Sequence, residues 1–225
     1  MQEICVAIFG EPEGIIFWQL IAATRFTIYL SLIAFLGGGV VAAIICFARI
    51  SPSNFAKRVS AGYIWSFQSI PLLMILFLAG LGVPRLFEIN VDPWTAAVVS
   101  LTIFTSAYLA EVWRGAFNAV PAGQWEGGAA LGLSFVRIFF IIILPQAYRY
   151  ALGPTVGFLV QIIKGTSLAY IIGFQDLMLL GKRWANAPIP GSEPYLVFPL
   201  MALIYFSLCF PLSKIATFLE KKHAL

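Results

Sequence analysis

Residues 26–48 read FTIYLSLIAFLGGGVVAAIICFA, a stretch of 23 residues without a charged side chain. An α-helix needs about 20 consecutive apolar residues to cross the hydrocarbon core of a bilayer. The whole chain agrees, because 60% of its 225 residues are hydrophobic and 11% are charged, whereas soluble domains are about 25% charged. The sequence therefore indicates an integral membrane protein and excludes a soluble globule or a disordered chain.

Further uncharged stretches predict additional spans. They cover residues 59–84, 93–110, 150–163 and 194–213. The third of these reaches spanning length only by continuing through Lys164 to about Ile172. We predict an all-α membrane protein of about five transmembrane helices, folded as a single transmembrane domain over residues 1–225.

Basic residues are divided unequally between the two sides of this arrangement. If the C-terminus is inside, the inner segments hold nine bases and three acids, and the outer segments hold three bases and seven acids. The inner bases are Arg49, Lys57, Arg58, Arg114, Arg137, Arg149, Lys214, Lys221 and Lys222. Cytoplasmic loops carry the excess of Lys and Arg, so we predict an N-terminus outside and a C-terminus in the cytoplasm. The acidic N-terminus shows no removable signal peptide.

The segments between the predicted spans differ in length. The longest, residues 111–149, is a predicted cytoplasmic loop with room for a partner. The connection 176–193 predicts a turn-rich outer cap, because it is rich in Pro and Gly. The N-terminal residues around Trp18, Gln19 and Arg25 predict a short interfacial helix that leads into the first span.

The long loop carries the most informative motif. From Glu126 to Pro145 it reads EGGAALGLSFVRIFFIIILP. A proline and a glycine break the chain just before it, and a short amphipathic helix from about Gln124 to Leu131 can follow. Its small residues leave the helix thin enough to lie in a groove of another protein. Glu126 suits the positive end of the helix dipole, and Gly132 can supply a left-handed cap that returns the chain to the membrane.

Composition alone allows a second interpretation of this run. Small residues beside a membrane are also typical of helix packing, and Pro121 and Pro145 serve as helix stops in either case. The spacing from Glu126 to Pro145 favours a docking element. Gly127 and Gly128 each cost about 0.5 to 1 kcal/mol in a helix interior, so we expect the helix to gain order on docking.

The spacing resembles the EAA signature of permease subunits of ABC importers, a Glu and two small residues, then a Gly, then Ile-x-Leu-Pro. The matching positions are Glu126, Gly127, Gly128, Gly132, Ile142, Leu144 and Pro145. EVWRG at 111–115, VPAGQWE at 120–126 and LPQA at 144–147 resemble the polar amino-acid uptake subfamily of histidine, glutamine and arginine permeases. The resemblance covers roughly residues 20 to 220 and implies the type I ABC importer permease fold.

This resemblance implies a cytoplasmic coupling helix that docks on an ATPase subunit. The coupling residues that it assigns are Gln124, Glu126, Gly127, Gly128, Gly132, Leu133 and Ser134. It also implies a multi-pass protein of the bacterial inner (plasma) membrane, in contact with lipid, with an ABC ATPase dimer, a second permease subunit and an amino-acid-binding protein as partners. ATP and Mg²⁺ would belong to the ATPase subunits. Because the sequence lacks a P-loop and a His cluster, we expect no catalysis, cofactor, metal site or nucleic-acid partner in this chain.

Polar residues inside the fourth span are candidates for the substrate pathway, because they are costly in hydrocarbon. Lys164 lies near mid-membrane and either holds a substrate carboxylate or is a structural charge. Gln161, Thr166 and Ser167 can add hydrogen bonds, although Ser and Thr often bond their own backbone. KGTSL resembles the subfamily's Lys-Asp-Thr-Ser-Leu, with Gly165 in place of the acid. We therefore expect neutral or acidic amino acids in preference to Arg or Lys, unless a different partner subunit supplies the acid.

The second span contains Gln68, Ser69 and Pro71 where relatives often have Arg-Gly-Thr-Pro. Pro71 would open the helical hydrogen-bond ladder toward a cavity, and a kink made for packing is an equal alternative. The predicted function is thus a permease subunit of an amino-acid ABC importer. The alternative is a self-sufficient secondary transporter or channel subunit, which usually shows an internal repeat that this chain lacks. The carried amino acid, and whether the second permease is identical, stay open.

Overall fold

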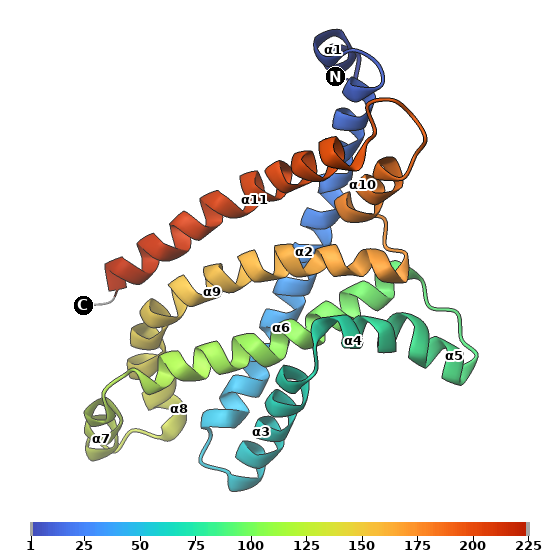
Figure 1. Ribbon diagram of the computed structural model, residues 1–225. Coiled ribbons are helices and arrows are strands. Elements are labelled where there is room, and N and C mark those ends of the chain that lie inside the picture. The colour runs from blue at the N-terminus through green and yellow to red at the C-terminus, as the bar shows by residue number, and fades with distance from the viewer. Residues whose placement is uncertain (1, 224–225) are drawn as a thin grey trace.

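The computed structural model describes residues 2–223, and helices supply the regular structure in this range (Figure 1). In chain order they are α1 (Gln2–Phe9), α2 (Glu13–Ile50), α3 (Asn54–Ser69), α4 (Leu72–Phe77), the π-helical η1 (Leu78–Gly82), α5 (Val83–Phe87), α6 (Pro93–Asn118), α7 (Ala122–Ala130), α8 (Phe135–Arg137), the π-helical η2 (Ile138–Ile143), α9 (Leu144–Thr166), the 3₁₀-helical η3 (Ser167–Ile172), α10 (Leu177–Ala185) and α11 (Pro194–His223). Within the described range, four helical segments are long and apolar enough to span a membrane, and a bent pair makes a fifth. The predicted all-α fold with about five spans is confirmed.

The main packing contact joins α2 to α6. Ala34, Gly38 and Ala42 follow one another at intervals of four residues on α2, and all three are buried. A Cβ on Gly38 would lie 2.5 Å from the Cβ of Thr105 on α6. Small residues at this spacing let two helix backbones approach closely in a membrane. The position of α6 against α2 therefore depends on the absence of a side chain at Gly38.

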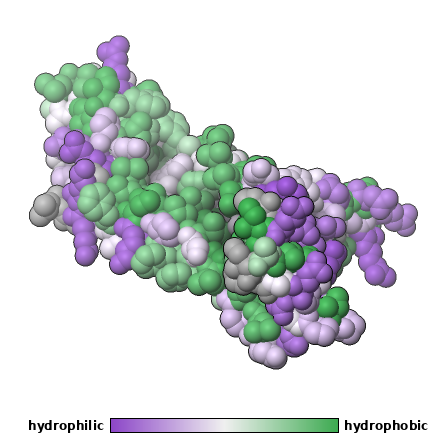
Figure 2. All heavy atoms as spheres, turned by 90° about the horizontal axis from the view of Figure 1, so that it is seen from above, coloured by the Kyte–Doolittle hydropathy of each residue, from purple (hydrophilic) through white to green (hydrophobic). Residues whose placement is uncertain are grey.

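The outer surface is strongly apolar between the ends of the molecule. Leu36, Val40 and Ile44 of α2 are each about two-thirds exposed, at 66%, 65% and 68%. Figure 2 shows hydrophobic residues over the middle of the molecule and hydrophilic residues gathered toward its ends. Large apolar surfaces of this kind need lipid or another protein to cover them. The chain is therefore suited to a bilayer.

The second span is broken rather than straight. Helix α3 and the segment from Leu72 to Phe87 meet at an angle of 96°, which is visible in Figure 1 where α3 turns into α4. Pro71 lies at the break as the residue before α4, with an extended backbone. Because Pro cannot donate a backbone hydrogen bond and restricts the residue before it, the helix ends at Ser69. The predicted interruption at Pro71 is confirmed.

The N-terminal prediction is wrong in its boundaries. Trp18, Gln19 and Arg25 belong to the long helix α2 and do not form a separate interfacial helix. The reason is tertiary packing, since Ile16 and Leu20 are buried in a cluster with residues of α10 and α11. The burial of these side chains favours continuation of the helix toward the N-terminus, and the short preceding helix is α1 instead.

The connection 176–193 is also more regular than predicted, because it contains the helix α10. Asp176 caps this helix, and its Oδ1 accepts a hydrogen bond from the backbone N–H of Leu179 at 2.9 Å. Trp184 donates from Nε1 to Oε1 of Gln19 at 3.1 Å, which ties α10 to α2. Burial raises the pKa of the Asp176 carboxyl to about 6, although backbone N–H groups oppose the shift. The prediction of a turn-rich cap missed the capping signal at Asp176.

The segment 111–149 is less of a loop than predicted. Helix α6 continues to Asn118 and helical structure resumes at Phe135, so residues 119–134 alone lie outside the long helices. Because Glu111 is the first charged residue after the uncharged stretch 93–110, the sequence predicts that the span ends there. In the structure Arg114 donates from Nε to Oε2 of Glu111 at 2.9 Å within the same helix, and such pairs three residues apart support a helix.

Candidate functional site

Helix α7 forms a short projection at one end of the molecule, beside α8 (Figure 1). It begins after Pro121 and ends at Ala130, and Gly132, two residues further on, has a φ of +71°. Gly132 N–H donates to the carbonyl of Ala129 at 2.9 Å, and Leu133 N–H donates to the carbonyl of Gly128 at 3.2 Å. These two bonds form a Schellman motif. The predicted helix in the loop and the left-handed conformation of Gly132 are both confirmed, and the helix starts two residues earlier than expected.

The two faces of α7 have different surroundings. Gln124, Glu126 and Gly127 are exposed. Trp125 faces the body of the protein, and its ring stacks on Phe135 with the ring centroids 5.5 Å apart. Gly128 is buried, and a Cβ at this position would lie 2.8 Å from Cγ1 of Ile138. One face of α7 is therefore fixed to the protein, and the other is free to meet a partner.

The chain after α7 holds it in place. Leu133 packs against the buried cluster of Val120, Ile138, Ile143 and Ala147. Ser134 is exposed, and its carbonyl accepts the N–H of Ile138 at 3.0 Å. Gln146 donates from Nε2 to Oε1 of Gln124 at 3.2 Å. Of the seven predicted coupling residues, five are exposed, and Gly128 and Leu133 are not; these two anchor the helix.

Lys164 and Ser167 lie together in a cavity of about 320 Å³ between α9, η3, α10 and α11. Its walls are Lys164, Ser167, Met178, Phe198, Met201, Ala202 and Tyr205. Lys164 is exposed. Gln161 lies one helical turn before it and is also exposed, but it does not line the cavity. The cavity thus presents one ammonium group within a mostly apolar wall.

The hydroxyl groups near Lys164 bond to the backbone. Thr166 is fully buried and donates from Oγ1 to the carbonyl of Ile163 at 2.8 Å. Ser167 donates from Oγ to the carbonyl of Lys164 at 2.6 Å. These are the intrahelical bonds that Ser and Thr often form in membrane helices. Thr166 does not line the cavity, whereas Ser167 does.

The residues of the second span lie outside this cavity. Gln68 is half-buried and donates from Nε2 to the carbonyl of Ala107 at 3.4 Å, while Ser69 and Pro71 are exposed at the break. The break nevertheless approaches the region of Lys164. A Cβ on Gly165 would lie 3.0 Å from Cδ2 of Leu72, so a carboxylate side chain at position 165 would press on the start of α4.

Sequence reasoning missed the residues opposite Lys164. Phe198, Met201 and Tyr205 come from α11, and Met178 comes from α10. These residues carry no motif, and they meet Lys164 only because the chain reverses between α9 and α11. A view of the tertiary fold is needed to find them, because apolar residues in a span look the same whether they face lipid or a cavity.

The fold and the site define a class of protein: a helical membrane permease with a broken span and a short docking helix at one end. The chain belongs to the family described as "Binding-protein-dependent transport system inner membrane component", which matches residues 34–224. It is thus a multi-pass membrane permease of the ABC importer class. The alternative of a self-sufficient transporter or channel is not supported.

Relatives and a solved structure agree over nearly the whole chain. It is similar to the probable amino-acid ABC transporter permease protein YckA of Bacillus subtilis, with 33% identity over 92% of this chain and 90% of that protein. The L-cystine transport system permease protein TcyB of the same organism is 30% identical over 92% and 87%. A chain from the "Crystal structure of an amino acid ABC transporter with histidines" matches with a TM-score of 0.82 and 27% identity, over 90% of this chain and 93% of that one.

The fold recurs at lower identity. A chain of the MetNI methionine ABC transporter in an inward-facing conformation matches with a TM-score of 0.71 at 17% identity, over 90% of this chain and 96% of that one. Because this structural match covers 90% of the chain, it includes the arrangement of the spans. The predicted type I ABC importer permease fold is therefore confirmed.

Proposed function

We propose that this permease carries polar amino acids, forms the translocation pathway with a second permease subunit, and docks on an ABC ATPase through α7. The observation that carries the proposal is the pair of faces on α7. Trp125 and Gly128 hold the helix to the body, and Glu126 stands exposed on the other side. A rigidly mounted helix with a free polar face can transmit force between two subunits.

The proposed substrate contact is Lys164. Its ammonium group forms no hydrogen bond or ion pair with any side chain that the structure describes, and no carboxylate lines the cavity around it. A lone cation of this kind favours the carboxylate that every amino acid carries. The close approach of Gly165 to Leu72 leaves little room for an acid beside it. Neutral and acidic amino acids are therefore the proposed substrates, and two relatives are named for the neutral amino acids cystine and glutamine.

Energy for transport would come from other chains. The proposed partners are an ATPase dimer that holds ATP and Mg²⁺, a second permease that is identical or related, and a soluble amino-acid-binding protein. Each permease contributes about five spans, and two copies enclose a pathway that one copy leaves open at the cavity of Lys164.

Reversal of charge at Glu126 tests the docking role. Glu126→Lys should leave the permease in the membrane but weaken retention of the ATPase during purification, since loss of a charge pair at an interface costs about 2 to 5 kcal/mol. The matched control is Glu3→Lys, the same change at an exposed residue of α1. Normal ATPase retention and normal stimulation of ATP hydrolysis by the binding protein in Glu126→Lys would contradict the proposal.

The proposed orientation, with the N-terminus outside and α7 in the cytoplasm, has its own test. In a chain whose native cysteines are replaced, a cysteine at Asn186 should react with an impermeant thiol reagent on intact cells, and one at Ser134 should not. Both positions are exposed, whereas Ser192 of the same outer connection is buried and cannot report. Labelling of Ser134→Cys from outside would reverse the proposed orientation.

A further inference from the structure

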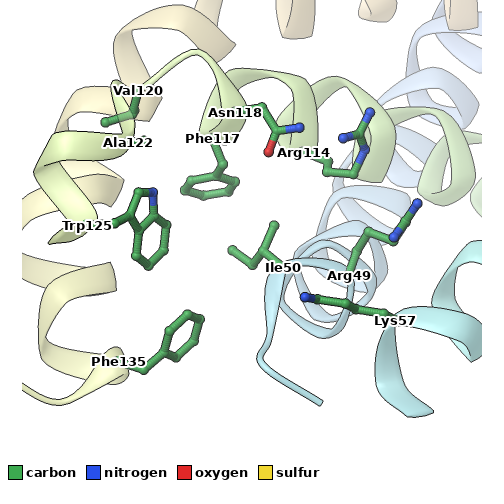
Figure 3. Close-up of a pocket in the computed structure, with 10 residues that line it drawn as sticks. All are labelled: Arg49, Ile50, Lys57, Arg114, Phe117, Asn118, Val120, Ala122, Trp125 and Phe135. Carbon is green, nitrogen blue, oxygen red and sulfur yellow. The ribbon is translucent and has the colours of Figure 1, made fainter. Parts of the chain in front are cut away.

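A second, larger cavity lies at the end of the molecule that carries α7. It has a volume of about 700 Å³ and opens between the end of α2, the start of α3, the end of α6 and α7. Its walls are Arg49, Ile50, Lys57, Arg114, Phe117, Asn118, Val120, Ala122, Trp125 and Phe135. Figure 3 shows the three basic side chains on one side and Trp125 and Phe135 on the other. The cavity belongs neither to the Lys164 region nor to the exposed face of α7.

The charge of this cavity is not neutralised by its walls. Arg49, Lys57 and Arg114 line it, and no Asp or Glu does. Glu111 forms a salt bridge with Arg114 and also attracts Arg49 without forming a salt bridge to it, while the side chain of Lys57 has no hydrogen bond or salt bridge to any side chain that the structure describes. All three bases are partly buried. One carboxylate beside three bases leaves a net positive charge, and partly desolvated cations attract an anion more strongly than cations in open water do.

An apolar groove adjoins the basic cavity. It has a volume of about 640 Å³ and is lined by Ala43, Ile44, Cys46, Phe47, Trp113, Phe117, Phe139, Phe140, Leu144 and Tyr148. Phe117 lines both cavities. The ring of Phe47 in the groove and the ring of Phe135 in the basic cavity have their centroids 6.3 Å apart, so an aromatic wall runs from one to the other. The groove faces outward along α2, where Ile44 is 68% exposed.

We propose that the two cavities together bind one anionic phospholipid of the bilayer, with its phosphate among Arg49, Lys57 and Arg114 and an acyl chain in the groove. The charge matches a phosphate, and the groove matches a hydrocarbon chain. The ends of α2 and α6 place the basic cavity at the membrane surface, where basic pockets between spans bind anionic head groups. Because Trp125 of α7 forms one wall, the lipid would also brace the docking helix from the side opposite to Glu126.

Lipid titration of the full-length permease, followed by native mass spectrometry, tests this site. Phosphatidylglycerol should bind about tenfold more tightly than phosphatidylcholine of the same chains, because its net negative charge adds to charge-assisted contacts. Arg49→Gln combined with Lys57→Gln should abolish this preference, and Arg49→Lys combined with Lys57→Arg should keep it. The matched control is Lys221→Gln with Lys222→Gln, two exposed bases that do not line the cavity. If the double Gln variant does not fold, Lys57→Gln alone is tested, and it should reduce the preference for phosphatidylglycerol.

Two further arms separate the lipid from other anions. Ala43→Trp fills the apolar groove and should weaken phosphatidylglycerol binding several-fold, and glycerol 3-phosphate should bind far more weakly than the lipid. Equal binding of glycerol 3-phosphate and phosphatidylglycerol would identify a site for a soluble phosphate and overturn the proposal. An unchanged lipid preference in the double Gln variant, together with loss of the copurified ATPase, would assign the cavity to an acidic protein segment and also overturn it.

Discussion

Adding one methyl group at Gly127 or at Gly128 should have opposite effects on the stability of α7. A Cβ at Gly127 would meet no atom within 4 Å, whereas a Cβ at Gly128 would lie 2.8 Å from Cγ1 of Ile138. In a helix interior, Gly→Ala stabilises by about 0.5 to 1 kcal/mol. At Gly127 this gain is unopposed. At Gly128 it is outweighed, because Ile138 is buried in the cluster behind α7 and overpacking costs about 1 to 3 kcal/mol.

Hydrogen exchange of the peptide that covers residues 121–134 measures this difference in the isolated permease. Gly127→Ala should slow exchange of the α7 amides about two- to fivefold, the factor that corresponds to about 0.5 to 1 kcal/mol of local stability. Gly128→Ala should accelerate it. The two variants control for each other, because both add one methyl group to neighbouring positions of one helix. Slower exchange in both variants would refute the packing of Gly128 against Ile138, and faster exchange in both would refute the free space at Gly127.

Three other perturbations have defined outcomes. Gly38→Ala should lower the melting temperature in detergent, because its Cβ would lie 2.5 Å from that of Thr105 and overpacking costs about 1 to 3 kcal/mol; Gly39→Ala, whose Cβ would meet only Trp113 at 3.8 Å, should not lower it. The free energy of unfolding should fall by about 3 kcal/mol as the pH rises from about 4 to about 6, because the Asp176 carboxyl has a pKa of about 6 in the folded protein and holds its proton more tightly there than in the unfolded chain. Melting temperatures measured across this pH range test the effect, and an equal fall in Asp176→Asn would exclude this carboxyl as its cause. Lys164→Ala should lower uptake by about tenfold or more, Lys164→Arg should retain most of it, and full uptake in the alanine variant would make the charge structural.

Local features of the sequence predicted local features of the structure well. The end of a helix at Pro71 and the left-handed conformation of Gly132 follow from backbone chemistry that acts within a few residues. The apolar stretches likewise located the spans, since burial in hydrocarbon requires a minimum length. The start of α2 was not predictable in this way, because Ile16 is buried by residues of α10 and α11, which are distant in the sequence.

The sequence predicts candidate site residues at α7 but not at the basic cavity. In the sequence, Arg49, Lys57 and Arg114 indicate only how the chain is oriented in the membrane. They lie on three different helices, and no spacing in the sequence relates them to Trp125. Glu126 and Gly132, by contrast, belong to one continuous motif, so their arrangement could be derived before the fold was known.

Helix α2 is long enough to connect the two ends of the molecule. A helix of 38 residues is about 57 Å long at 1.5 Å per residue, nearly twice the hydrocarbon thickness of about 30 Å. Its first turns are tied to α10 through Gln19 and Trp184, and Arg49 in its last turn lines the basic cavity. One continuous helix therefore joins the α10 cap to the wall of the basic cavity beside α7.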